Sequence, residues 1–187
     1  MQLKNYFIYI ILVLSIYSTS CNRYIDAVAE KDKLPKTVGY LTVYPDSNLF
    51  SYKSNVALTR DIEKIYPKSF KITLPKDLKY YEVVGSTEFV FYYANNQAVM
   101  VKVDLDRKSS AIKNYLSYVP NDQEIEQIVQ SKLASAQSKY DIKKIRIAAK
   151  NKQYVVKEKG VLLLLYNIQP KNHDIFVKSL KSFDWQP

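Results

Sequence analysis

The 187-residue sequence contains one cysteine, one histidine and three glycines. A single cysteine excludes a disulfide within the chain. One cysteine and one histidine also exclude zinc or copper sites built from these residues, because such sites need three or four ligands. Gly39, Gly85 and Gly160 lie too far apart in the sequence to form a phosphate-binding loop.

Catalytic motifs are equally scarce. His173, the one imidazole, falls in the first turn of an expected helix, where a side chain most often faces solvent, and the sequence suggests no nucleophile beside it. Ser110 and Lys113 match the SxxK pattern of penicillin-binding enzymes, but the accompanying motifs are missing. Asp104 and Asp106 suggest a calcium loop that lacks its glycine and distal glutamate. We therefore predict no catalytic residue, cofactor or metal.

The one cysteine follows a leader-like N-terminus. Lys4 is the only charge among the first twenty residues, Tyr6 to Tyr17 form an uncharged apolar run of twelve, and Ser18-Thr19-Ser20 precede Cys21. Crossing the hydrocarbon of a bilayer takes about 20 apolar residues, so this run is too short for a stable span. A basic start, a short apolar core and small residues are typical of a secretory signal peptide.

The stretch Ser18-Thr19-Ser20-Cys21 resembles the lipobox of bacterial lipoproteins, with Ser18 in place of the usual leucine, as in loose versions from Bacteroidetes. The resemblance implies cleavage between Ser20 and Cys21, and both a thioether-linked diacylglycerol and an amide-linked acyl chain on Cys21. More than one chain is needed, since a single one gives marginal anchoring at roughly 0.8 kcal/mol per buried methylene. Asn22 stands where an aspartate would signal inner-membrane retention, so we predict a cell-envelope lipoprotein in the outer membrane.

Two alternatives remain for Cys21. The N-terminus could be an uncleaved anchor, or an ordinary cleaved signal could leave Cys21 as a free thiol. A leftover cysteine in an exported protein invites intermolecular pairing. Acylation removes that liability, so the lipoprotein interpretation is favoured.

A second notable feature of the sequence is its formal net charge of +10. Removing Lys4 leaves 27 of the 28 basic residues against 18 acidic ones, or +9. Together with 17 tyrosines, this charge would suggest nucleic-acid binding in a cytosolic protein, but export argues against it. The charge either reflects an A/T-rich genome, which we favour, or attracts anionic headgroups or an anionic envelope polymer.

Local patterns divide the chain into a signal peptide (residues 1–20), a charged, aperiodic tether (21–36) and one domain (37–187). Apolar runs and alternation predict strands over Val38–Tyr44, Phe70–Leu74, Tyr80–Val84, Glu88–Ala94, Ala98–Leu105, Lys144–Ala149, Gln153–Lys157 and Val161–Ile168.

For three of these strands, the sequence also predicts how they pair or where they lie in the sheet. The fourth and fifth strands should form a hairpin around Asn95-Asn96, because Asn tolerates the positive φ of a tight turn. The last strand is apolar on both faces and should be central in its sheet.

Helical spacing predicts helices over residues 58–65, 121–140 and 172–185. Asn121 and Glu124 fit a capping box for the second helix, and Asn172 should cap the third. The order of elements predicts an α+β domain in which helices pack on an antiparallel sheet.

This layout resembles the PsbP/Mog1-like fold, which includes many small bacterial lipoproteins. The resemblance covers residues 68 to 185 and is carried by SFKITLPKDLKYYEV, EFVFYYANNQAVMVKV and HDIFVKSLKSFDW. A fainter likeness joins LPKTVGYLTVYP and SLKSFDW to the gliding-motility lipoproteins of Bacteroidetes.

Seven basic residues and one acid fall within residues 143–159. Strand alternation would place Lys144, Arg146 and Lys150 on one face, with Ile145 and Ile147 on the core side. Such a face could contact an anion or lipid headgroups. The charge could equally prevent pairing at a sheet edge. An ordinary solvated face is the favoured interpretation.

Together these observations predict a lipid-anchored, monomeric cell-envelope protein of non-catalytic, binding or assembly type. Its partners would be membrane lipid, through acylated Cys21, and an envelope protein, with no nucleic acid. The alternatives are an envelope hydrolase with unidentified carboxylates, or an immunity-type lipoprotein that blocks a toxin. A deep apolar pocket with two converging carboxylates would favour the hydrolase.

Overall fold

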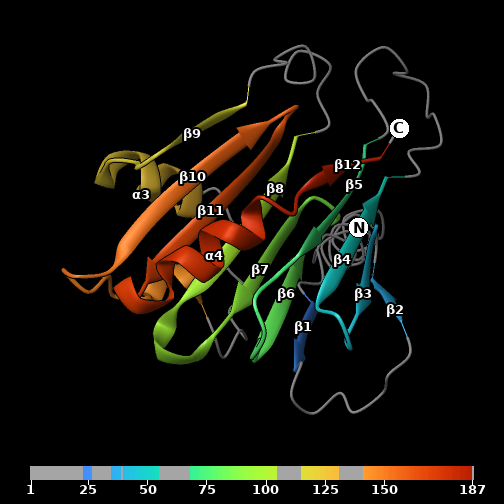
Figure 1. Cartoon of the computed structure of the whole chain (residues 1–187), viewed down its shortest axis with the longest axis horizontal. Helices are drawn as coiled ribbons and strands as arrows, with labels where there is room; N and C mark the ends of the chain where they lie inside the picture. Colours follow the sequence, from blue (N-terminus) through green and yellow to red (C-terminus); the bar gives the residue numbers. More distant parts are fainter. Residues whose placement is uncertain are drawn as a thin grey trace, which may run out of the picture.

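Strands dominate the computed structural model, which describes residues 23–26, 35–38, 40–54, 68–104, 115–130 and 141–186. They form two antiparallel sheets in one domain, and the sheets lie face to face (Figure 1). The predicted antiparallel architecture is therefore confirmed. It contains more sheet than expected, because the prediction of one sheet did not include the second, five-stranded sheet.

The larger sheet has seven strands in the order β1-β6-β7-β8-β11-β10-β9. In that order they span Arg23–Asp26, Tyr80–Val84, Glu88–Tyr92, Ala98–Val103, Val161–Ile168, Lys152–Glu158 and Leu116–Tyr118. β11 lies between β8 and β10, and its Leu163, Leu164 and Leu165 are at most 1% exposed. The prediction of a central strand covered on both faces is thus confirmed.

The smaller sheet has five strands in the order β12-β5-β4-β3-β2. In that order they span Asp184–Trp185, Ser69–Thr73, Leu49–Lys53, Leu41–Tyr44 and Lys36–Val38. The single strand expected over Val38–Tyr44 is wrong: Val38 pairs with Leu41, so β2 and β3 form a hairpin. The sequence reading also missed β4, which follows the turn at Pro45–Asn48.

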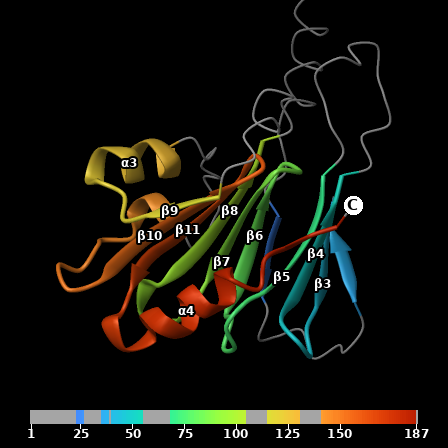
Figure 2. The ribbon, with the colours of Figure 1, turned by 45° about the horizontal axis from the view of Figure 1, so that its top comes forward.

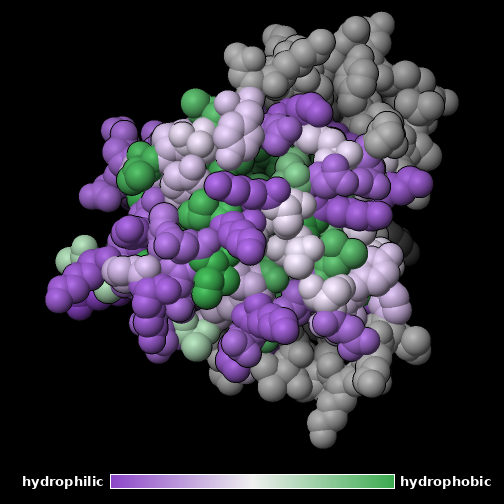
Figure 3. All heavy atoms as spheres, in the orientation of Figure 1, coloured by the Kyte–Doolittle hydropathy of each residue, from purple (hydrophilic) through white to green (hydrophobic). Residues whose placement is uncertain are grey.

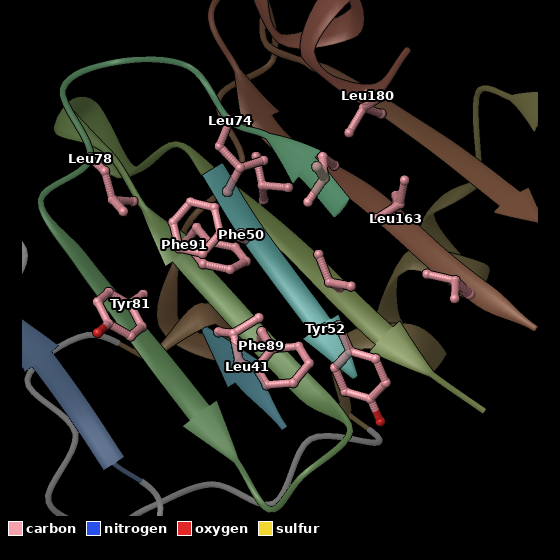
Figure 4. Packing of buried hydrophobic residues seen from close by; sticks show 14 of the residues in the cluster. Leu41, Phe50, Tyr52, Leu74, Leu78, Tyr81, Phe89, Phe91, Leu163 and Leu180 are labelled. Carbon is pink, nitrogen blue, oxygen red and sulfur yellow. The ribbon is translucent and has the colours of Figure 1, made fainter. Parts of the chain in front are cut away.

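The main core lies between the two sheets and is rich in aromatic rings (Figure 4). Phe50 of β4 meets Phe91 of β7 at 4.4 Å between ring centroids. Tyr52 stacks on Phe70 at 5.0 Å and meets the edge of Phe89 at 5.7 Å. Because side chains alternate along a strand, these residues all point into the space between the sheets.

Helix α3 (Asp122–Gln130) covers the other face of the larger sheet, opposite α4 (His173–Leu180), as Figure 2 shows. Its Ile125, Ile128 and Val129 are buried. Asn121 Oδ1 accepts the N–H of Glu124 at 2.8 Å, which confirms the predicted N-cap. In a capping box, the side chain of Glu124 would accept the backbone N–H of Asn121. Instead, the Glu124 carboxylate accepts hydrogen bonds from the side chains of Tyr118 and Lys157.

Helix α4 packs on β11 and β5 through Phe176 and Leu180. It ends at Leu180 rather than at Trp185, because the backbone of Trp185 pairs with Phe70 in β5. Asn172 is the N-cap residue of α4, as predicted, but its side chain makes no capping hydrogen bond.

Two further expectations concern the N-terminal part of the chain. Arg23–Asp26, within the expected tether, pairs with β6 as strand β1, and Lys36 opens β2. Part of that segment therefore belongs to the sheets. The helix expected over residues 58–65 lies outside the described residues.

Candidate ligand-binding pocket

The site residues that the sequence analysis named fall in two groups, and only the three cations lie among the described residues. Ser20 and Cys21 lie outside the described residues. Lys144, Arg146 and Lys150 are all exposed, but they do not share a strand face. Lys144 ends a short 3-10 helix, η2 (Ile142–Lys144), and the following residues up to 151 form neither helix nor strand.

Asn167 explains why the strand expected over Lys144–Ala149 does not form. Its backbone is left-handed, with a φ of 57°, at a point where β10 and β11 shift register. Its Oδ1 accepts the backbone N–H of Ala148 at 3.0 Å and the side-chain amide of Asn151 at 2.9 Å. The side chain of Asn167 thus binds two residues of the segment, Ala148 and Asn151. Ile147, which was expected in the core, is 39% exposed.

Lys144, Arg146 and Lys150 therefore project from an irregular segment and not from one face of a strand. Lys144 Nζ lies 3.8 Å from the carboxylate of Asp141, and the lysine side chain is 82% exposed. Such an ion pair contributes little, because water screens it. The exposure of these side chains agrees with the solvated-surface interpretation.

His173 is less exposed than expected. Its side chain is 19% exposed, and its ring meets the ring of Tyr154 edge-on at 6.3 Å between centroids. Its Nδ1 lies 3.4 Å from Asp174 Oδ1, whose side chain is fully exposed. An exposed carboxylate at this distance orients an imidazole weakly, so the pair lacks the geometry of a catalytic base.

A pocket that the sequence did not indicate lies where three connections meet at one end of the sheets. We call it the amide pocket, and its volume is about 410 Å³. It is formed by the β5–β6 loop, the β7–β8 loop and the segment around the start of α4. Its lining residues are Pro75, Lys76, Asp77, Tyr93, Ala94, Asn95, Gln97, Gln169, Lys171, Asn172, Ile175 and Phe176.

Gln97 holds two of these connections together. It is 3% exposed, and its Nε2 donates to the carbonyl of Ala94 at 2.9 Å within its own loop. Its Oε1 accepts the backbone N–H of Gln169 and the side-chain amide of Asn172, both at 3.0 Å. The side chain of Asn172 is thereby drawn away from the helix cap and into the wall of the pocket.

Tyr93 links the third connection. Its hydroxyl donates to the carbonyl of Pro75 at 3.2 Å, and its ring meets that of Phe176 edge-on at 4.9 Å between centroids. Burial, and secondarily the charge of Asp77, raises the pKa of the Tyr93 hydroxyl, which therefore stays protonated and can donate. The floor of the pocket is thus fixed by packing and hydrogen bonds.

The loops around the pocket contain left-handed residues. Asp77, Asn95 and Asn96 have φ values of 66°, 61° and 57°. The positive φ predicted for the two asparagines is confirmed, although Tyr92 pairs with Ala98, so the hairpin loop has five residues rather than two. Asn and Asp tolerate this conformation better than other non-glycine residues.

The exposed rim carries charges of both signs, from Lys76, Lys171 and Asp77. Ile175, also at the rim, is 60% exposed. Figure 3 shows green apolar atoms scattered among purple hydrophilic ones on the face of the molecule that carries α4. Gln169 adds a buried Oε1 that accepts no hydrogen bond from the part of the chain that the structure describes.

A second hollow of about 340 Å³ lies between α3 and the Lys143–Ile147 segment. Two carboxylates, Asp122 and Glu126, contribute to its lining, one helical turn apart on the exposed side of α3. Glu126 accepts the side-chain amide of Gln130 at 2.6 Å. This arrangement is that of a solvated helix surface rather than a deep pocket with converging acids.

The amide pocket escaped sequence reasoning because its members come from three separate segments between residues 75 and 176. Their shared signal is a concentration of Asn and Gln in loops, at 95–97 and 169–172, and this composition also marks ordinary turns. Pairing of β8 with β11 brings the two loops to the same end of the larger sheet.

The described ranges were also searched for metal-binding clusters and for membrane-spanning helices. There, no three His, Cys, Asp or Glu side chains are grouped closely enough to hold a metal ion. No helix in these ranges combines the length and apolar character that crossing a membrane requires. Comparisons with protein-family models, with curated proteins and with solved structures give no match.

Proposed function

We propose that this chain is a lipid-anchored cell-envelope protein whose domain binds a ligand or partner and catalyses no reaction. The observation that carries the location is the order of a basic start, a twelve-residue apolar run and Ser18-Thr19-Ser20 before the single cysteine, Cys21. These are the parts of a lipoprotein signal. The outer membrane is the proposed destination, and the acylated chain is proposed to act as a monomer.

The amide pocket supports binding over catalysis. Its lining includes one carboxylate, Asp77, whereas hydrolysis of a glycosidic bond normally needs two acidic groups on opposite sides of that bond. The hydrogen bonds of Gln97 and Tyr93 hold the pocket in shape before any ligand arrives. A preformed pocket lowers the entropic cost of binding.

The domain is also proposed to belong to the PsbP/Mog1-like group. The stretches that carry this resemblance correspond to β5 and β6, to the β7–β8 hairpin, and to α4 with β12. An experimental structure whose strand order departs from that of the group would contradict the assignment. The fainter likeness to gliding-motility lipoproteins remains a proposal about lineage.

Substitution of Cys21 tests the anchor. In bacteria fed a labelled fatty acid, Cys21→Ser should abolish labelling and release the chain from membranes, because the sulfur that carries the diacylglycerol is gone. Ser18→Leu is the matched control: it restores the usual lipobox residue and should keep both labelling and membrane retention. If Cys21→Ser remains labelled and membrane-bound, the lipoprotein proposal is wrong.

A further inference from the structure

We propose that the lipid anchor on Cys21 holds one end of the domain directly against the bilayer, where the domain contacts lipid headgroups. The proposal rests on the lipoprotein function proposed above and adds to it the orientation of the domain. The observation that carries it is the position of strand β1. Arg23 already pairs with Val83 of β6, so the sheet begins two residues after the cysteine.

The link between the cysteine and the sheet is very short. Consecutive Cα atoms lie about 3.8 Å apart, so the Cα atoms of Cys21 and Arg23 are separated by at most about 7.6 Å. A free tether from Cys21 to Lys36 could instead extend over roughly 50 Å. The headgroup layer is roughly 5–8 Å thick on each side of the hydrocarbon. The start of β1 therefore lies within or beside that layer when Cys21 is acylated.

Strand pairing shows which parts of the larger sheet lie at this end. β1 and β6 are antiparallel, so the start of β1 lies beside the end of β6 and the β6–β7 turn, residues 85–87. The N–H of Val103 donates to the carbonyl of Thr87 at 2.7 Å, and the N–H of Asp104 donates to the carbonyl of Gly160 at 2.8 Å. These bonds add the end of β8 and the β10–β11 turn to the same row, which we call the anchor end.

The smaller sheet reaches the anchor end as well. The side-chain ammonium of Lys68, which directly precedes β5, donates to the carbonyl of Asp104. The ammonium of Lys159, in the β10–β11 turn, lies over the ring of Trp185 in β12, 5.4 Å from its centroid. Strands of both sheets therefore end at the side of the domain from which Cys21 departs.

Side chains at the anchor end suit the boundary between lipid and water. Tyr115 and Leu116 are 57% and 52% exposed, and Leu116 pairs with Lys157 where β9 begins. Trp185 is half-buried beside the exposed Lys159. Tyrosine and tryptophan are enriched at membrane interfaces, and lysine can lie along apolar surface while its ammonium stays in water. Contact with the headgroup layer would remove the exposed apolar area from water.

Among the described side chains, the charges at the anchor end nearly balance. Lys159 is exposed there, and so is Lys53, which pairs with Ser69 at the start of β5. Asp104 is also exposed, and Glu158 is half-buried. Attraction to anionic lipid therefore adds little, and the short link itself sets the contact.

The opposite end of the same strands faces away from the bilayer. Asp26, Tyr80 and Tyr92 are successive partners across β1, β6 and β7 at that end, and the β7–β8 loop of the amide pocket follows Tyr92. Figure 1 shows the β10–β11 turn and the β7–β8 loop at opposite ends of the larger sheet. The five residues of β7 span roughly 17 Å between these ends. The amide pocket is thus presented to the aqueous compartment, where a partner can reach it.

The basic segment lies at the pocket end too. Lys144, Arg146 and Lys150 precede Lys152, which pairs with Ile168 at the end of β11. β11 runs from the anchor end to the amide pocket. We therefore expect these three cations to lie away from the headgroups to which Cys21 is anchored.

Single-cysteine labelling tests the orientation, because acylation blocks the only native thiol and a maleimide fluorophore then reacts only with an introduced cysteine. Ser86→Cys places the probe in the β6–β7 turn, and Ala94→Cys places it after the other end of β7. Each labelled full chain, purified with its acyl groups, is reconstituted in neutral phosphatidylcholine vesicles that carry nitroxide on a fraction of the headgroups. We expect at least a roughly twofold loss of fluorescence at position 86 and none at position 94, since the length of β7, roughly 17 Å, separates them.

A longer link is the matched control. Insertion of about twenty Gly and Ser residues between Asn22 and Arg23 keeps the anchor and the domain but gives the link an r.m.s. length of roughly 25 Å. Quenching at position 86 should then fall to the level at position 94. Circular dichroism of each variant shows whether it is folded. If Ser86→Cys does not fold, Lys53→Cys replaces it, because Lys53 is exposed at the same end.

Equal quenching at the two positions, stronger quenching at position 94, or undiminished quenching at position 86 with the longer link would each overturn the proposed orientation. Labelling of the wild-type chain by maleimide would reveal a free Cys21 thiol, and the anchor would then fail together with the orientation. An acylated chain that is quenched equally at both positions overturns the orientation alone. The two failures can therefore be told apart.

Discussion

The side-chain amide of Asn172 donates to Gln97 Oε1 at 3.0 Å, and this bond joins the β7–β8 loop to the segment that begins α4. The same oxygen accepts the backbone N–H of Gln169, so one buried side chain satisfies two donors. Replacement by leucine keeps the approximate volume but leaves both donors without this acceptor. We expect Gln97→Leu to lower the free energy of unfolding by about 1–3 kcal/mol, measured by urea denaturation.

Lys171→Ala is the control for this variant. Lys171 lines the same pocket but is exposed, so its loss should change the free energy of unfolding by less than about 0.5 kcal/mol. Equal stability of Gln97→Leu and the wild type would show that the Gln97 bonds do not hold the loops together.

A second prediction concerns Asn167, which fastens the basic segment. Asn167→Ala removes the acceptor of the Ala148 N–H and cannot adopt a φ of 57° without strain. Hydrogen exchange of the Ala148 amide should become much faster, while exchange in the β7–β8 hairpin stays slow. Asn167→Gly separates the two effects: it relieves the backbone strain, yet Ala148 should remain unprotected. Continued protection of Ala148 in both variants would contradict the assigned role.

Local sequence patterns correctly predicted the elements whose structure depends mainly on residues close by in the sequence. The uninterrupted apolar stretch around Leu163–Leu165 predicts a strand covered on both faces, because each successive side chain must be buried. Asn121 predicts the start of α3, because its side chain satisfies a free N–H three residues later. The β7–β8 hairpin likewise follows from two apolar runs separated by turn-forming residues.

The errors arose where a distant side chain decides the local structure. Ile145 and Ile147 alternate as in a strand, but Asn167 Oδ1 accepts the Ala148 N–H, and this segment belongs to neither sheet of the described residues. Asn172 follows the rule for a helix cap, but buried Gln97, 75 residues away, accepts its amide. The amide pocket depends on the same long-range pairings, so the sequence indicated its residue types without indicating that they meet.

The link between α3 and the larger sheet gives a third prediction, at low pH. Hydrogen bonding from Tyr118 lowers the pKa of Glu124 below its usual 4.5, and Lys157, 3.0 Å away, lowers it further against the opposing effect of burial. A depressed pKa in the folded state means that stability is present above pH 4.5 and is lost as pH falls through the folded pKa.

Glu124→Gln cannot make this titration. We expect the variant to be about 1 kcal/mol less stable at neutral pH, since the group is partly exposed and its ion pair is screened. Its stability should then fall less steeply than that of the wild type below pH 4.5. Urea unfolding across this range measures both curves, and parallel curves would mean that Glu124 has no special role.

The buried tyrosines give a fourth prediction, at high pH. Burial, and then the negative charge of Glu82, raises the pKa of the Tyr92 hydroxyl far above 10.0. The hydroxyl donates to Glu82 Oε2 at 2.9 Å, so ionisation in the folded state would also break this bond. A raised folded pKa means that the contribution to stability is complete below pH 10 and is lost as pH rises above it, because the unfolded tyrosine then releases its proton.

Tyr92→Phe isolates this contribution. At neutral pH the variant should be less stable by about 1–3 kcal/mol, because the hydrogen bond to Glu82 is lost. Above pH 10 its stability should decrease less steeply than that of the wild type, by about 1.4 kcal/mol for each pH unit, which is the value of one proton. Tyr115→Phe, at a residue 57% exposed, is the matched control and should leave neutral-pH stability unchanged. If the stability difference between Tyr92→Phe and the wild type stays constant as the pH rises, the Tyr92 hydroxyl must titrate equally in the folded and unfolded chains, which its burial forbids.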